Sequence, residues 1–221
     1  MIYLTGDLHG DLSRFKEIER SGIKKGDTLI VCGDFGFLWE GGRSEQKALQ
    51  WIGKRKYQVL FVDGCHENHR LLNEYPETEF AQGRARRISG GLTMLLRGEI
   101  YELEGNRVFA MGGGDSIEQF EQGKEEAEFL PSEEEIARAR QNLEQAGNRV
   151  DLIVTHDAPG KIREFIDIES REEWTRLHTF FDELSRTVQF RGWYLGKYHL
   201  NKRVPPYYYL LFTQVVRFES D

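Results

Sequence analysis

Short runs of apolar and β-branched residues recur along the chain, and each run ends in polar residues. The runs predict strands over Ile2–Thr5, Thr28–Cys32, Gln58–Val62, Leu152–Thr155 and Trp193–Leu195. A continuous apolar run of this length is typical of a strand that is buried on both faces. The pattern therefore predicts strands with a packed layer on either side.

Between these strands, apolar residues recur at the spacing of a helical face. The spacing predicts a helix that begins at Asp11 and helices over Arg43–Lys54 and Glu172–Leu184. Another helix is predicted to begin at Ser132, because a serine followed three residues later by Glu135 is a capping-box pattern. Strands that alternate with helices favour an α/β fold.

Two further regions predict antiparallel pairs of strands. Leu92–Leu103 and Arg107–Met111 flank a turn signal at residues 104–106, and Tyr207–Leu211 and Gln214–Phe218 form a second β-rich pair. Antiparallel pairs beside alternating strands and helices predict α/β layers with mixed sheets.

The composition is that of a globular protein. The chain has 221 residues, of which 39% are hydrophobic, and its longest apolar run, Tyr207–Phe212, is far shorter than the roughly 20 residues that a membrane-spanning helix needs. No repeat or Pro-, Gly- or Ser-rich linker divides the sequence, so we expect a single domain over residues 1–221. The N-terminus lacks a basic segment and turns polar early, which argues against a secretory signal.

The net charge and the cysteine content limit which binding partners and which cellular compartment we expect. The chain has 30 Lys and Arg against 37 Asp and Glu, a net charge of −7, so we expect neither an extended nucleic acid nor a membrane as partner. The two cysteines, Cys32 and Cys65, form no disulfide framework and favour a reducing cytoplasm. The sequence leaves the oligomeric state open.

Polar clusters that hold most of the histidines close the predicted strands. The clusters are Gly6–Gly10, Gly33–Asp34, Gly64–Glu67, Thr155–Asp157 and Gly196–His199. Carboxylates and neutral imidazoles are suitable ligands for Mn, Fe, Zn or Ni, and ligands of layered α/β folds gather at the carboxyl ends of strands. A single Asp-x-His is most often an ordinary surface turn, but clusters that close several separate strands predict a metal centre.

The clusters follow the order of the motifs of a known family. That order is Asp-x-His, Gly-Asp, Gly-Asn-His-Asp/Glu, a lone His and Gly-His-x-His, and from Asp7 to His199 the chain resembles the calcineurin-like metallophosphoesterase superfamily. The resemblance implies a four-layer α/β/β/α sandwich with two mixed β-sheets. It also implies two metal ions and hydrolysis of phosphomonoesters or phosphodiesters by metal-bound hydroxide.

The first metal site of the family is complete in this sequence. Carried over by position, the resemblance assigns the first metal to Asp7, His9 and His199, and it gives Asp34 the role of bridging both metals. The implied cofactor is a divalent transition metal (Mn, Fe, Zn or Ni), bound as one or two ions.

The second metal site departs from the family pattern twice. The Asn, the lone His and the first His of the last motif correspond here to Cys65, His156 and Lys197. A charged lysine cannot ligate a cation, whereas a thiolate is a good ligand for zinc or iron. Either the second site is empty and Lys197 supplies positive charge to the substrate, or a softer metal binds through Cys65 and His156, or the whole centre is degenerate. We favour the first of these outcomes.

Further candidate catalytic and orienting residues lie next to the metal ligands in the sequence. The resemblance assigns His66 as the general acid that protonates the leaving oxygen, and Glu67 or Asp63 could orient its ring. Asp157, next to His156, is a candidate to orient an imidazole.

Weaker signals lie outside the motifs. Arg84 and Arg86, with Arg87, form a small basic cluster that could bind a substrate phosphate, although a solvated face is the commoner outcome. His69 and His178 fall on helical segments, where we expect solvated or packing side chains.

The sequence also allows predictions for three segments between the motifs. Residues Phe35–Trp39 could pack a nucleobase or a partner, although packing within the core or the loop is more usual. Gly112–Gly114 closes a strand and could line the site or form a plain turn. Glu118–Glu128 is rich in glutamate and is expected to be a solvated acidic stretch.

The ordered ligand set predicts a metal-dependent phosphoesterase that acts on a phosphorylated small molecule or nucleotide. The alternative is a catalytically degenerate protein that uses the same fold as a binding or regulatory scaffold, because Cys65 and Lys197 both depart from the pattern. The complete first site and the presence of His66 favour the enzyme over the scaffold.

Overall fold

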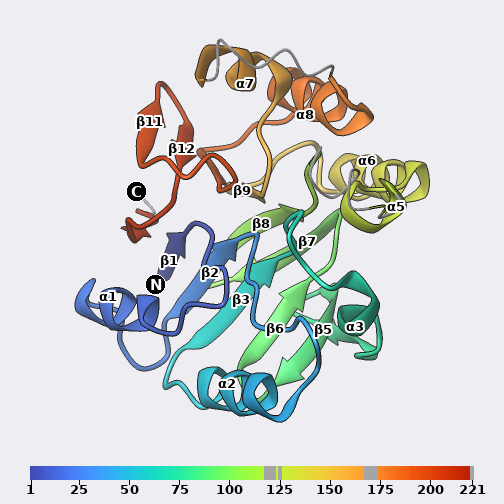
Figure 1. Ribbon diagram of the computed structural model, residues 1–221. Coiled ribbons are helices and arrows are strands. Elements are labelled where there is room, and N and C mark those ends of the chain that lie inside the picture. The colour runs from blue at the N-terminus through green and yellow to red at the C-terminus, as the bar shows by residue number, and fades with distance from the viewer. Residues whose placement is uncertain (117–122, 124–125, 167–173, 220–221) are drawn as a thin grey trace.

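The computed structural model describes residues 1–116, 123, 126–166 and 174–219, and these residues form two β-sheets (Figure 1). Across the first sheet lie β13 (Val216–Arg217), β1 (Ile2–Thr5), β2 (Thr28–Cys32), β3 (Gln58–Val62), β6 (Leu92–Leu95), β5 (Gly83–Ser89) and β4 (Glu77–Phe80). Across the second lie β11 (Lys202–Val204), β12 (Tyr208–Leu210), β10 (Gly192–Leu195), β9 (Leu152–Thr155), β8 (Asn106–Met111) and β7 (Glu99–Leu103).

Each sheet has a parallel centre and antiparallel edges. Strands β1, β2, β3 and β6 run parallel to one another, as do β8, β9, β10 and β12. The outer strands β13, β5, β4, β7 and β11 join antiparallel. Both sheets are therefore mixed, as predicted, and the carboxyl ends of the parallel strands of one sheet lie along one edge.

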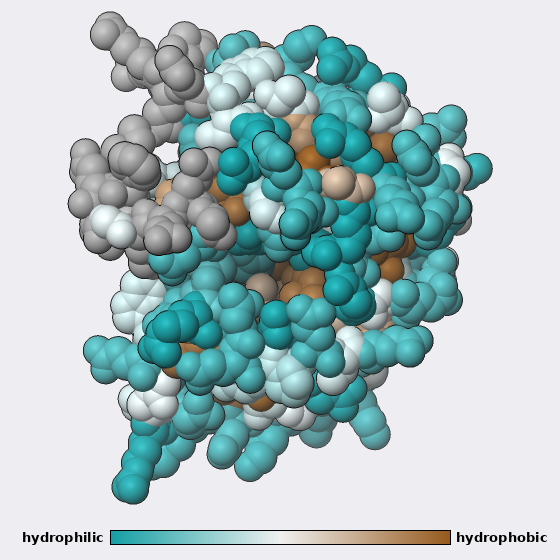
Figure 2. All heavy atoms as spheres, turned by 90° about the vertical axis from the view of Figure 1, so that its right-hand side faces the viewer, coloured by the Kyte–Doolittle hydropathy of each residue, from teal (hydrophilic) through white to brown (hydrophobic). Residues whose placement is uncertain are grey.

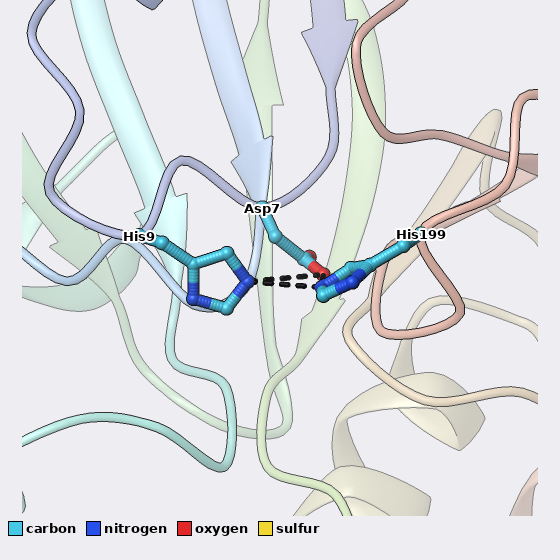
Figure 3. A group of neighbouring side chains, drawn as sticks. All are labelled: Asp7, His9 and His199. Atoms are coloured by element: carbon cyan, nitrogen blue, oxygen red, sulfur yellow. Dashed lines mark hydrogen bonds and ion pairs between the residues drawn. The ribbon is translucent and has the colours of Figure 1, made fainter.

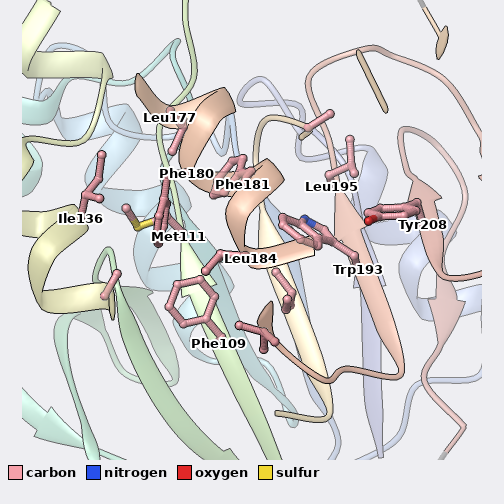
Figure 4. Packing of buried hydrophobic residues seen from close by; sticks show 14 of the residues in the cluster. Phe109, Met111, Ile136, Leu177, Phe180, Phe181, Leu184, Trp193, Leu195 and Tyr208 are labelled. Atoms are coloured by element: carbon pink, nitrogen blue, oxygen red, sulfur yellow. The ribbon is translucent and has the colours of Figure 1, made fainter. Parts of the chain in front are cut away.

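The strands are buried on both faces because their side chains alternate between two cores. In β2, Leu29 and Val31 pack beneath α1 (Arg14–Arg20) and α2 (Arg43–Gly53), whereas Ile30 and Cys32 pack between the sheets. On the second sheet the outer layer comes from α6 (Glu133–Gln145) and α8 (Arg176–Thr187), whose apolar faces pack on Trp193 and its neighbours (Figure 4). The layers follow the order α/β/β/α, which confirms the predicted fold class.

Shorter helices lie in the connections: α3 (His69–Asn73), α5 (Glu126–Phe129) and α7 (Gly160–Ile166). The side of the molecule that carries α3, α5 and α6 is hydrophilic over most of its area, and its visible apolar atoms lie in several separate places (Figure 2). In the part of the chain that the structure describes, no helix has the length and apolar character needed to cross a membrane.

The predicted start of α6 is confirmed by its capping box. The Ser132 hydroxyl accepts a hydrogen bond from the Glu135 backbone N–H at 3.1 Å, and the Glu135 carboxylate accepts one from the Ser132 N–H at 2.8 Å. The first helix begins later than predicted, at Arg14, because Asp11 caps a preceding turn by accepting from the Ser13 N–H at 2.8 Å. Each of these bonds satisfies a backbone N–H before the helix supplies its own partners.

Both predicted antiparallel pairs are partly wrong, because the chain crosses between the sheets inside them. Leu92–Leu103 divides into β6 and β7, and the crossing turns at Gly98, whose φ is +80°. Strand β7 then pairs with β8, as predicted. Strands β12 and β13 do not pair: β12 joins β10 and β11, whereas β13 joins β1 in the other sheet.

Two expectations fall partly outside the described residues. Most of Glu118–Glu128 and the first residues of the helix predicted over Glu172–Leu184 belong to the gaps, and the described part of that helix is α8.

Candidate metal centre

The polar clusters that follow β1, β2, β3, β9 and β10 meet between the two sheets. Asp7 Oδ1, from the first sheet, lies 3.6 Å from His156 Nδ1, from the second. The Lys197 backbone N–H donates to both carboxylate oxygens of Asp7, at 3.0 and 3.1 Å. Residues that are far apart in the sequence therefore contact the same buried carboxylate, that of Asp7.

The candidate first-metal ligands Asp7, His9 and His199 form one compact group (Figure 3). His9 Nε2 lies 2.9 Å from His199 Nε2, which lies 3.1 Å from Asp7 Oδ2. The hydrogen bond to Asp7 raises the pKa of His199, whereas burial lowers the pKa of His9. The three ligand atoms lie within 4.8 Å of one another, and two imidazoles with one carboxylate fit a divalent transition metal.

Asp34 lies beside this group, at the turn that follows β2. Its backbone carbonyl accepts hydrogen bonds from the N–H groups of Leu8 and His9 at 3.0 and 2.9 Å, so the turn fixes the loop that carries the first ligands. Asp34 Oδ1 lies 3.5 Å from His156 Nε2. Although burial alone would raise the pKa of Asp34, the nearby His156 and the hydrogen bonds from His66 hold it well below its usual range.

Several of these residues have left-handed backbone conformations. The φ angles of His9, Asp34, Lys197 and His199 are +46°, +41°, +65° and +49°. A non-glycine residue in this region costs about 1–3 kcal/mol, and such conformations are concentrated at functional sites. The surrounding hydrogen bonds hold the strained turns, which aims the side chains of neighbouring strands at one place.

Glycines let the backbone approach the two buried carboxylates closely. A Cβ atom at Gly196 would overlap Asp7 Oδ1, and one at Gly64 would overlap Asp34 Oδ1. A larger residue at either position would displace a candidate ligand. Gly114 lies closely against His156 and Asp157, whereas Gly112 lies against Asp63 and Gly113 against the Phe129 carbonyl, so only the last glycine of the segment borders the site.

Cys65 forms a second candidate metal group with Asp34 and His66, whereas His156 belongs with Asp7 and Asp34 to another. Cys65 Sγ lies 3.5 Å from His156 Nε2 and 3.3 Å from His66 Nδ1, and the cysteine is almost fully buried. Although burial alone would raise the pKa of Cys65, its hydrogen bonds with the two histidines lower that pKa below the usual thiol value. His156 Nδ1 lies 3.2 Å from the backbone carbonyl of Cys32.

His66 is oriented by Asp34. Its Nδ1 lies 3.0 Å from Asp34 Oδ2, and its backbone N–H donates to Asp34 Oδ1 at 2.8 Å. This contact raises the pKa of His66 to about 11. The expectation that Glu67 or Asp63 performs this orienting role needs correction, because the structure directs both carboxylates to other partners.

Glu67 supports the turn after β2. Its carboxylate accepts from the backbone N–H groups of Phe35 and Gly36 at 2.6 and 3.3 Å, and burial raises its pKa to about 8. Asp63 instead accepts from Arg97 at 2.6 Å and lies 3.1 Å from His69 Nε2.

Lys197 is tied to carboxylates of this chain. Its Nζ donates to Asp115 Oδ1 at 2.7 Å and to the Asp115 backbone carbonyl, and it lies 3.3 Å from Asp157 Oδ2. These negative charges outweigh the cost of burial and raise the pKa of Lys197. The Lys197 ammonium therefore has two carboxylate partners within the chain, and its contact with a substrate phosphate stays a prediction.

The imidazole that Asp157 contacts is that of His178. Asp157 Oδ2 lies 3.3 Å from His178 Nε2, and Asp157 Oδ1 accepts from the Tyr198 hydroxyl at 2.6 Å. His178 is fully buried and His69 is nearly so, which agrees with the packing alternative of the prediction, and both are hydrogen-bond partners of buried aspartates.

The structure does not bring Arg84 and Arg86 into this centre. Both lie on β5, where Arg84 pairs with Glu99 at 2.7 Å and Arg86 pairs with Glu77 at 3.0 Å. Their proposed contact with substrate phosphate is corrected, because their guanidinium groups are held by carboxylates at the edge of the first sheet.

A cavity of about 520 Å³ opens beside His9 and His66. It is lined by Leu12, Phe37, Trp39, Ala48, Gly10, Gly36, Ser44 and Glu45. Phe35, Phe37 and Leu38 are buried as the core interpretation predicts, whereas Trp39 is 45% exposed. Among the described residues, no lysine or arginine lines the cavity, so its wall is mainly apolar and partly acidic.

Comparisons with known proteins agree with this arrangement. A family model described as calcineurin-like phosphoesterase matches residues 1–192, a span that ends before Lys197 and His199. The chain is also similar to a lariat debranching enzyme of Drosophila melanogaster, with 24% identity over 238 residues. The match covers 90% of this chain and 42% of the relative, so the chain spans less than half of that protein's length.

Proposed function

Because the chain belongs to the calcineurin-like phosphoesterase family, we propose that it hydrolyses a phosphoester with the help of divalent transition-metal ions. The observation that carries this proposal is the convergence of Asp7, His9 and His199 beside Asp34. When bound, such an ion lowers the pKa of a coordinated water and offsets the charge of the phosphoryl group.

In this proposal the two buried carboxylates organise the centre. Asp7, His9 and His199 hold the first ion, and Asp34 reaches both positions because its oxygens face His66 and His156 while its carbonyl fixes the His9 loop. The hydrogen bonds that already restrain these side chains reduce the reorganisation needed on binding.

We assign the proton transfer to His66. Its side chain is half-buried, contacts Asp34 and lines the cavity, so it lies between the carboxylate centre and the space available to a leaving group. An imidazolium held by a carboxylate can donate a proton to a leaving oxygen. Asp34 acts as the group that keeps the ring in place.

The cavity favours a substrate with an apolar or aromatic group next to its phosphate. The exposed Trp39 offers aromatic surface for a nucleobase-sized ring, whereas Glu45 would repel further phosphates. The net charge of −7 also argues against an extended nucleic acid. We therefore propose a mononucleotide-like phosphoester, a smaller substrate than the name of the lariat debranching relative indicates for that protein.

Metal analysis combined with turnover tests the proposed function. The purified chain is loaded separately with Mn, Zn, Ni or Fe, its metal content is measured, and p-nitrophenyl phosphate and bis-p-nitrophenyl phosphate are assayed. We expect at least one tightly bound ion per chain and metal-dependent hydrolysis of one ester. Less than one ion per chain, with no turnover under any loading, would exclude an enzyme.

The scaffold alternative has one structural observation in its favour. Lys197, at the position where the family has a ligand, is neutralised by Asp115 and Asp157 within the chain. A scaffold would retain this ionic cluster without turnover. The same metal and activity measurements distinguish the two functions.

A further inference from the structure

The thiol of Cys65 lies close to other side chains that can coordinate a metal ion. Its sulfur lies 3.5 Å from His156 Nε2, and His156 Nε2 lies 3.5 Å from Asp34 Oδ1. Donors bound to one zinc ion at about 2.0–2.3 Å in tetrahedral geometry lie roughly 3.3–3.6 Å apart. These two separations match edges of such a site, and Cys65 Sγ also lies within 4.8 Å of a carboxylate oxygen of Asp34.

The hydrogen bonds around His156 leave the correct nitrogen available. Its Nδ1 lies 3.2 Å from the backbone carbonyl of Cys32, which can only accept a hydrogen bond, so Nδ1 carries the proton. In the neutral ring the lone pair is then on Nε2, which faces Cys65 and Asp34. Metal-bound histidines commonly donate their other ring N–H in this way.

The charge of Lys197 does not oppose a cation at this place. Its ammonium is paired with Asp115 Oδ1 at 2.7 Å and with Asp157 Oδ2 at 3.3 Å. Asp115 also pairs with Arg163 at 3.2 Å, so the cluster holds two cations and two carboxylates and carries no excess positive charge towards Cys65. The lysine fills the place of a lost ligand without neutralising the remaining donors.

We infer that Asp34, Cys65 and His156 form a thiolate site for a soft divalent metal, Zn²⁺ or Co²⁺, as the second ion of the centre. The inference deepens the proposed function, since Asp34 belongs to both. On binding, the Cys65 S–H bond breaks, its proton passes to the buffer, and a sulfur–metal bond forms. A thiolate and a carboxylate together balance the two positive charges of the ion.

His66 stabilises the sulfur in this arrangement without serving as a ligand. Its Nδ1 lies 3.3 Å from Cys65 Sγ and 3.0 Å from Asp34 Oδ2, so a ring N–H at this nitrogen can donate to either anion. Groups that donate to metal ligands orient them and tune the metal. Three protein ligands leave a fourth position open, which is typical of catalytic zinc sites.

Cobalt substitution tests the thiolate site directly. The full-length protein, stripped of metal, is titrated with Co²⁺ while its near-ultraviolet absorption is recorded, because a sulfur-to-cobalt charge-transfer band appears only when a thiolate binds the ion. We expect this band to accompany one of two bound equivalents. Absence of the band when two equivalents are bound, or saturation at one equivalent without it, would overturn the inference.

Two matched variants identify which cysteine sulfur binds the cobalt ion. Cys65→Ala abolishes the band, whereas Cys32→Ala retains it, because Cys32 is equally buried but packs between the sheets. Cys65→Asn provides a second test with an oxygen donor, and it is expected to bind two equivalents without the band. A band that persists in Cys65→Ala, or that disappears in Cys32→Ala while circular dichroism is unchanged, would contradict the assignment.

The same titration separates this inference from the proposed function. A Cys65-dependent band in a protein without phosphoesterase turnover would support the thiolate site and reject the enzyme. Turnover in a protein that never shows the band would support the enzyme and reject the thiolate site.

Discussion

Lys197 and Asp115 form a largely buried ion pair at the edge of the metal centre, with Nζ 2.7 Å from Oδ1 and side chains 16% and 14% exposed. Asp157 shares the same ammonium at 3.3 Å. Removing one partner of a buried pair leaves the other charge uncompensated, which commonly costs about 3–5 kcal/mol. We therefore expect Lys197→Met to reduce the free energy of unfolding by about that amount, measured by urea denaturation.

An exposed pair of similar geometry provides the control for this prediction. Arg140 Nη2 lies 2.7 Å from Glu183 Oε2, but both side chains are exposed, and such pairs contribute about 0–1 kcal/mol. Arg140→Met should therefore lower the free energy of unfolding much less than Lys197→Met. Equal effects of the two substitutions would show that burial of the Lys197 cluster does not govern its contribution.

The Asp63–Arg97 pair makes stability depend on pH. Although burial alone would raise the pKa of Asp63, the charge of Arg97 holds it well below its usual range. Because the pKa in the folded state is below the unfolded value of about 3.9, the ionised carboxylate stabilises the fold above that pH. This stabilisation is lost as the pH falls towards the pKa of the folded state.

Comparison with Asp63→Asn tests this dependence. At pH 7 the substitution should lower the free energy of unfolding by about 3–5 kcal/mol, because Arg97 loses its fully buried charged partner and keeps only Glu135. Below about pH 4 the difference in the free energy of unfolding between variant and wild type should become smaller. If the difference in the free energy of unfolding stays constant from pH 7 to pH 3, the pKa of Asp63 is not lowered in the folded state.

Trp39 is expected to contribute to recognition of an aromatic ring. Trp39→Ala removes an exposed aromatic wall of the cavity, and aromatic contacts contribute about 0.5–1.5 kcal/mol. Inhibition by adenosine 5′-monophosphate should therefore weaken about 2- to 10-fold, while inhibition by methyl phosphate stays unchanged.

Trp51→Ala is the matched control for Trp39→Ala. Trp51 is also exposed, but it packs against Phe15 and Arg55 and does not line the cavity. Its removal should leave both inhibition constants unchanged. If the two tryptophan variants weaken inhibition by adenosine 5′-monophosphate equally, the cavity beside His66 is not the site that binds the ring.

The strands and their polar ends were predictable because each is encoded locally. The apolar run Thr28–Cys32 forms β2 with its predicted limits, and Asp34 follows it directly. Pairing partners were less predictable, because β12 and β13 are adjacent in sequence yet join different sheets. The choice between sheets depends on tertiary packing, which the apolar pattern of one segment does not record.

The partners of charged residues in the site were the least predictable feature. Lys197 and Asp115 are 82 positions apart, and no spacing rule connects them. The partner of His178 was also missed, because helical spacing indicates which face is covered but not that the covered face holds Asp157. A histidine within the apolar stripe of α8 was the available signal for a buried hydrogen bond.

The most direct test of the central claim is the rate of bis-p-nitrophenyl phosphate hydrolysis by metal-loaded wild type and Asp34→Asn. Asp34 contacts His66, fixes the His9 loop and reaches both candidate metal positions. We predict metal-dependent turnover by the wild type and a loss of at least about 100-fold in a variant that remains folded, equivalent to roughly 2.7 kcal/mol of transition-state stabilisation. Equal rates for the two proteins would contradict the account.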